Sequence, residues 1–201
     1  PELDFFLHHV NGKLNRRKVR VRSYLACDLH FMEVKRKTNK GKTREFRVEV
    51  PWNGNPADTG EEAPALVSEY GSADLSLLKP LLYSRFKRIT LVNLDRTERV
   101  TLDFDLSYQR ASDDRVVSMP GTGVVEIKRE KYSDSPLRRI LRDLRIKKRG
   151  FSKYCLGILL TELSPKTNRY KLKIRFIQKK ITQHEKYKFK IYSCCLFGFN
   201  H

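Results

Sequence analysis

The chain of 201 residues carries 42 Lys and Arg side chains against 23 Asp and Glu, which gives a formal net charge of +19. Hydrophobic residues make up 39% of it, too many for a disordered polycation, and no apolar run reaches the roughly 20 residues of a membrane-spanning helix. We therefore expect one folded, soluble domain over residues 1–201 whose partners are polyanions.

The cysteines do not follow the pattern of a zinc site or a redox motif. None of the four forms a C-x-x-C pair, and none has a histidine at zinc-finger spacing. Such a pattern is typical of reduced thiols, and no signal peptide is visible. We therefore expect a cytoplasmic protein.

Charged and apolar residues alternate near the start of the chain, which indicates strands with one polar and one apolar face. The clearest case has Lys18, Arg20 and Arg22 on one face and Val19 and Val21 on the other. An antiparallel meander is expected from three such strands, over residues 18–25, 31–37 and 42–50.

Residues 51–64 are rich in proline, glycine and acids, which predicts a surface loop. A short helix should follow, with Asp74 as its N-cap and Pro80 bending or ending it. Alternation then predicts strands over residues 83–94, 99–108 and 123–130, with a hairpin turn at residues 93–96.

Apolar residues spaced i, i+3, i+4 and i+7 predict a helix over residues 136–148, which Ser135 caps and Gly150 ends. Its other face is either solvated or a recognition surface, and it carries Arg138, Arg139, Arg142 and Arg145. Alternation returns in the basic last third and predicts a strand over residues 170–178.

Any one of these charged strand faces could be an ordinary solvent-exposed face of a sheet. Several strands share the pattern, however, and acids recur among the cations in Glu33-x-Lys35 and Glu126-x-Lys128. A barrel with its charged face inward and helices packed outside would satisfy both faces. Its cations would bind phosphate groups, and a carboxylate such as that of Glu126 would hold Mg²⁺ or Mn²⁺.

Six motifs follow one another along the chain: NRRKVRVRSY at residues 15–24, MEVK at 32–35, YSR at 83–85, ERVTLD at 98–103, VEIK at 125–128 and FSKY at 151–154. The ordered set resembles the catalytic domain of the VTC (vacuolar transporter chaperone) family. That family is the polyphosphate polymerase branch of the triphosphate tunnel metalloenzyme (CYTH-like) superfamily. The resemblance covers about residues 3–179 and leaves residues 180–201 as a terminal strand or tail.

The resemblance implies an α+β fold, in which an antiparallel β-barrel tunnel has helices packed outside. The family places one more strand ahead of this region, so we expect the N-terminal strand to be missing here. The implied activity transfers the terminal phosphoryl group of a nucleoside triphosphate such as ATP to polyphosphate, with Mn²⁺ or Mg²⁺ as cofactor.

The resemblance also implies roles for individual residues. Glu126 would be the metal ligand, and Lys153, Arg99 and Arg85 would be catalytic. The implied phosphate-binding residues are Arg20, Arg22, Lys35, Tyr83, Arg85, Arg99, Lys128, Ser152 and Lys153.

Three other functions stay open at this point. A triphosphatase of the same superfamily would use the same tunnel, and a polyphosphate sensor would bind chains without turnover. The third is a nucleic-acid-binding module, suggested by the charge and by the arginine-faced helix, although we expect nucleoside triphosphate and polyphosphate as partners rather than nucleic acid.

Overall fold

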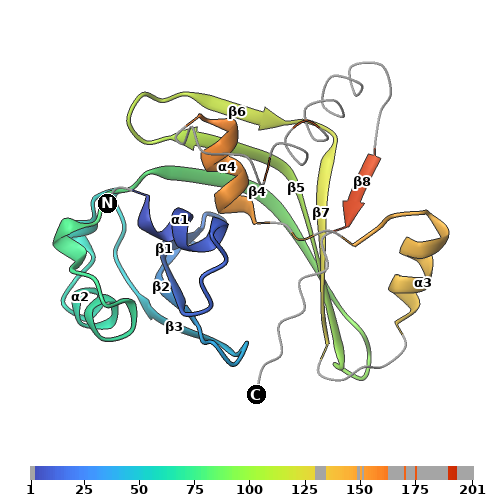
Figure 1. Cartoon of the computed structure of the whole chain (residues 1–201), viewed down its shortest axis with the longest axis horizontal. Helices are drawn as coiled ribbons and strands as arrows, with labels where there is room; N and C mark the ends of the chain where they lie inside the picture. The colour runs from blue at the N-terminus through green and yellow to red at the C-terminus, as the bar shows by residue number, and fades with distance from the viewer. Residues whose placement is uncertain are drawn as a thin grey trace. The chain divides into compact units, whose positions relative to one another are not determined.

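The computed structural model describes residues 3–129, 135–148, 150, 152–162, 170, 175 and 190–193. The chain divides into two compact units, residues 1–80 and residues 81–199. Each unit contains one sheet, drawn in blue in the first unit and in green to yellow in the second, apart from one red strand near the C-terminal end (Figure 1). The two units are described separately below.

The first unit is built on a three-stranded antiparallel sheet with its middle strand second in the chain. The alternating pattern near the start of the chain is confirmed, because the observed strands begin and end within two residues of the predicted ones. They are β1 (Arg16–Tyr24), β2 (Leu29–Lys37) and β3 (Thr43–Glu49).

Helical segments after β3 cover the apolar face of this sheet. Met32 and Val34 of β2 are buried in one cluster with Ala63 and Val67. Those two residues belong to α2 (Glu62–Leu66) and to the π-helical turn η2 (Val67–Gly71). The predicted loop over residues 51–64 therefore ends inside a helix, because Pro64 lies in a first helical turn, where proline is tolerated.

Three further short helices complete the first unit. The 3₁₀ turn η1 (Pro56–Asp58) lies in the predicted loop, and η3 (Leu75–Leu77) begins at the predicted cap, where Asp74 accepts a hydrogen bond from the Ser76 N–H at 2.9 Å. Helix α1 (Asp4–Val10) precedes β1 and is anchored by the fully buried Phe6.

The second unit contains a five-stranded sheet in which β5 is central, and it confirms the strands predicted near residues 83–94, 99–108 and 123–130. β8 runs parallel to β7, whereas the other pairs are antiparallel. The strand predicted over residues 170–178 lies outside the described residues, apart from Tyr170 and Arg175. The strands are β4 (Leu82–Val92), β5 (Glu98–Arg110), β6 (Val116–Met119), β7 (Thr122–Arg129) and β8 (Lys190–Ser193).

Two helices pack on opposite faces of the second sheet. On one face, Leu141 of α3 (Pro136–Asp143) is buried against Val125 and Ile127 of β7. On the other face, Leu156 of α4 (Lys153–Leu160) is buried with Val124 and with residues of β5 beyond a bulge at residues 104–107. α3 and α4 are the two orange helices of Figure 1.

Helix α3 starts at the predicted cap, where the Ser135 hydroxyl oxygen accepts from the Arg138 N–H, but it ends earlier than predicted. Arg145 adopts a left-handed backbone conformation with φ of 55°, and the Ile146 N–H donates to the Leu141 carbonyl at 2.7 Å. This arrangement is a helix-ending motif usually made with glycine. The sequence pattern missed it because the ending residue is an arginine.

The expectation of one curved sheet closed into a tunnel is not confirmed. The strands that the structure describes form two separate open sheets, and no closed barrel is found among them. Alternation identifies strands and their faces, but it carries no information on which distant strands pair, and here β3 and β4 are separated by four short helical elements.

Helix α4 approaches the sheet so closely that one glycine is required. A Cβ atom at Gly157 would overlap Leu82 and would lie 2.5 Å from Cδ1 of the Tyr108 ring. We expect Gly157→Ala to destabilise the second unit by about 1–3 kcal/mol, because overpacking outweighs alanine's better helix propensity. Urea unfolding followed by circular dichroism measures this. Gly123→Ala is the matched control, since its Cβ would meet neighbours only at 3.5 Å or more, and an equal loss there would contradict the close-approach argument.

Candidate functional site

The charged face of the first sheet is organised around a buried acid. Glu33 of β2 is 2% exposed and lies opposite Arg20 of β1. Arg20 Nε donates to Glu33 Oε2 at 2.7 Å, and Arg22 Nε lies 3.3 Å from Glu33 Oε1. One carboxylate therefore contacts both Arg20 and Arg22.

A second acid extends this network to the next strand. Glu45 of β3 lies 2.9 Å from Lys35 Nζ and 3.6 Å from Arg20 Nη2. Burial opposes ionisation of Glu45, but the hydrogen bond and charge of Lys35 and the charge of Arg20 lower its pKa below the usual value. Burial, together with the charge of Arg22, also lowers the pKa of Arg20, despite the opposing effect of Glu33. The predicted residues Arg20, Arg22 and Lys35 thus share one electrostatically coupled face.

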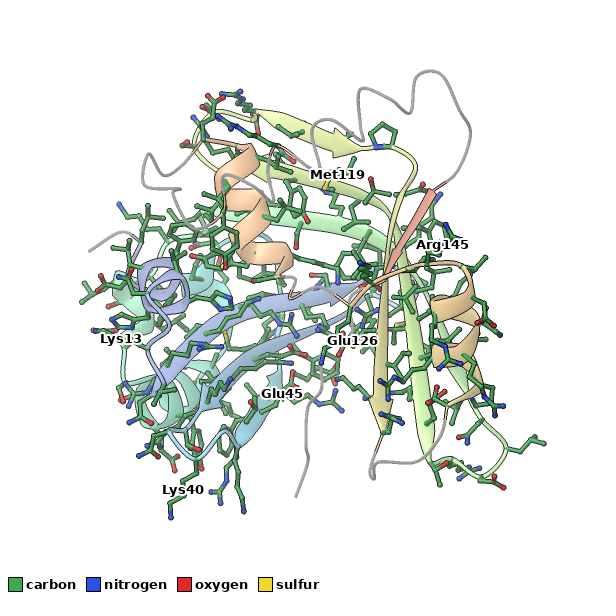
Figure 2. All side chains as sticks on the ribbon, turned by 45° about the vertical axis from the view of Figure 1, so that its right-hand side comes forward. Lys13, Lys40, Glu45, Met119, Glu126 and Arg145 are labelled. Atoms are coloured by element: carbon green, nitrogen blue, oxygen red, sulfur yellow. The ribbon has the colours of Figure 1, made fainter. Side chains whose placement is uncertain are left out.

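The second sheet has a charged face of its own on β5 and β7. Arg99 lies opposite Lys128, and Thr101 lies opposite Glu126, so these side chains project from the same face. Figure 2 shows Glu126 on the side of β7 away from α3 and Arg145. The Glu126 side chain is 17% exposed, and its Oε1 lies 3.4 Å from Lys128 Nζ. The Thr101 hydroxyl beside it is buried and has no hydrogen-bond partner among the described residues.

The same face continues to a fully buried acid, Asp103. Arg88 of β4 donates two hydrogen bonds to it, from Nε to Oδ1 at 2.5 Å and from Nη2 to Oδ2 at 2.8 Å. Lys153 Nζ forms a close ion pair with Oδ2. Burial favours the protonated carboxyl, but these two cations outweigh it and lower the pKa of Asp103.

The start of α4 brings Lys153 to this face. The Ser152 hydroxyl oxygen accepts a hydrogen bond from the Cys155 N–H at 3.3 Å, so Ser152 is the N-cap and Lys153 is the first helical residue. Its ammonium lies 4.8 Å from the centre of the Phe86 ring, within cation–π range. Sequence reasoning proposed Ser152 as a phosphate contact, whereas its visible contact is this helix cap.

Two of the predicted phosphate-binding residues, Tyr83 and Arg85, do not lie on this charged face. Tyr83 and Arg85 alternate with Phe86 and Arg88 along β4, so they project from the opposite face of that strand. Arg85 Nη1 donates to Gln109 at 2.5 Å on that face. The structure therefore does not bring Arg85 and Tyr83 together with Glu126.

Sequence reasoning missed Arg88. Both sets of alternating residues in β4 contain cations, and the set with Tyr83, Arg85 and Lys87 matched the expected polar face better. Arg88 could have been recognised from its position opposite Asp103. That position follows only from the pairing of β4 with β5 and from the place of the bulge, and the sequence of one strand shows neither.

The acids on the two charged faces are paired with cations. Within the described ranges, no three His, Cys, Asp or Glu side chains cluster as a multidentate metal site. A single carboxylate beside cations can still share a hard divalent ion with phosphate oxygens and water.

Comparison with known proteins identifies the family. A family model described as the VTC domain matches residues 1–162, and the chain belongs to this family, which is associated with phosphotransferase activity related to polyphosphate synthesis. No curated protein and no solved structure matches the chain. None of the helices in the described ranges is long and apolar enough to cross a membrane.

Proposed function

We propose that this VTC domain synthesises polyphosphate from nucleoside triphosphate by metal-dependent phosphoryl transfer. The observation that carries the proposal is the presence, in each unit, of a sheet face with several cations fixed by acids and still partly open to solvent. Arginine forks and lysine ammonium groups in fixed positions are suited to phosphate oxygens.

The residues around Glu126 fit a divalent cation. A carboxylate is a hard oxygen ligand, and the 3.4 Å separation from Lys128 Nζ is longer than a charged hydrogen bond of about 2.7–2.9 Å. The buried Thr101 hydroxyl opposite it offers a further oxygen. We propose Glu126 as the protein ligand of Mn²⁺ or Mg²⁺, which supplies positive charge to the phosphate oxygens when bound.

The cations of this chain then bind and orient the phosphates. Lys153 and Lys128 flank the Asp103 and Glu126 region of the second sheet, and Arg99 extends it. Phosphoryl transfer depends mainly on positioning and charge stabilisation, so no covalent intermediate on the protein is needed. The proposed location stays cytoplasmic, as the sequence predicts.

Affinity for triphosphate tests the binding part of this proposal. We expect Lys153→Ala to weaken tripolyphosphate binding at least tenfold, because a charged hydrogen bond contributes about 1.5–3 kcal/mol. Arg138→Ala on exposed α3 removes the same charge and should cost about 1 kcal/mol or less. Titration calorimetry at matched salt compares the two variants. Equal losses would instead favour a diffuse polyanion-binding surface, such as that of a nucleic-acid-binding module.

A further inference from the structure

Asp103 makes an unusual set of contacts for an acid on a cationic face. Its carboxylate is fully buried in the second sheet, yet it accepts the two-pronged contact of Arg88 and the ion pair of Lys153. A buried carboxylate without a paired cation raises the free energy of the folded state. Movement of Arg88 or Lys153 away from Asp103 is therefore unfavourable. The acid therefore restrains both side chains.

The restrained cations come from different elements but meet at one place. Arg88 extends from β4, and Lys153 extends from the first turn of α4. The Phe86 ring lies under both, 5.2 Å from the Arg88 guanidinium carbon and 4.8 Å from Lys153 Nζ. Their side chains remain 30% and 20% exposed, respectively. Two cations are thus held side by side with part of each open to solvent.

We propose that Asp103 is a positioning residue that holds Arg88 and Lys153 as a pair for one phosphate group, and that Arg88 is a further phosphate contact of this domain. This inference rests on the proposed function and names an additional part of its binding site. Long cationic side chains lose rotamer freedom when they bind an anion, and restraint by Asp103 removes that loss before the phosphate arrives.

Substitution of Asp103 by Asn separates this role from a simple effect of charge, because the two predict opposite changes in tripolyphosphate affinity. Asp103→Asn keeps the shape of the side chain and makes the site more positive by one charge. If the only effect of Asp103 were to lower the net positive charge of the site, tripolyphosphate would bind more tightly to Asp103→Asn. If Asp103 positions the two cations, binding should weaken by at least about tenfold, comparable to the loss of a charged hydrogen bond.

Asp105→Asn is the matched control in the same strand. Asp105 is exposed, pairs with Lys87 at 2.9 Å, and has a φ of 52°, which asparagine tolerates. This substitution changes the net charge equally, and binding should be unchanged or slightly tighter. Calorimetry with tripolyphosphate and no added metal, on the full chain well below each variant's unfolding temperature, gives the comparison. Asp103→Asn binding as tightly as Asp105→Asn would overturn the proposal.

A second variant keeps the test decisive if Asp103→Asn does not fold. Arg88→Lys retains the positive charge but removes the planar fork, so it should weaken binding about fivefold or more, and wild-type affinity in this variant would overturn the role of Arg88. Because binding is measured without turnover, the two proposals can fail separately. A wild-type protein that binds tripolyphosphate but makes no polymer would refute the proposed activity alone, whereas one that does not bind would refute both.

Discussion

Replacing Glu126 with Gln should lower metal-dependent turnover of nucleoside triphosphate by on the order of 100-fold, because the amide keeps the shape but lacks the charge that a hard cation requires. The fold should survive, since Glu126 is partly exposed and its ion pair with Lys128 is long. Initial rates at a series of Mn²⁺ concentrations measure the effect. Tripolyphosphate binding without metal should become slightly tighter, because one anion has left an anion-binding face.

Asp95→Asn in the exposed turn between β4 and β5 is the control for Glu126→Gln, and its rate should equal that of the wild type. Metal dependence that survives in Glu126→Gln would contradict the assignment of the ligand. Glu33, the other acid of a Glu-x-Lys motif, is poorly placed to replace it, since each of its oxygens already contacts an arginine.

Glu33→Gln should destabilise the first unit by about 3 kcal/mol, among the largest stability effects expected of any single substitution here. Glu33 is buried, and the substitution removes the charge that pairs with Arg22 and leaves Arg20 with only its longer contact to Glu45. Trp52, the only tryptophan, lies in this unit, so its fluorescence during urea unfolding reports the change.

Glu49→Gln provides the comparison for that experiment. Glu49 lies at the exposed end of β3 and projects from the same charged face, so the substitution makes the same change in net charge. We expect an effect within about 0.5 kcal/mol, as for most surface substitutions. A similar midpoint shift in both variants would mean that net charge, and not the buried Glu33 pair, controls the stability of this sheet.

Local features of the fold could be predicted from the sequence because they depend on side-chain periodicity. Alternation along β1 placed Arg20 and Arg22 on one face and Val19 and Val21 on the other, and the buried cluster of the first unit confirms that division. The caps Asp74 and Ser135 were also predicted, since short polar side chains satisfy free N–H groups at helix starts.

The features that were not predicted depend on contacts between distant segments. Arg88 was missed because its partner Asp103 becomes visible only when β4 pairs with β5 around the bulge. α4 was missed because its apolar residues are buried on nearly all sides and show little periodicity, and Gly157 weakens the helix signal further. Closure of a barrel depends on pairings that no single strand encodes.

Incubation of the protein with ATP and Mn²⁺, followed by gel electrophoresis and staining for polyphosphate, tests the proposed activity most directly. We expect a ladder of polyphosphate chains that lengthens with time, matched by release of ADP, and no ladder from Glu126→Gln. Release of orthophosphate without chains would identify a triphosphatase. Unchanged ATP in a protein that binds polyphosphate would identify a sensor, and either result would contradict the proposed polymerase.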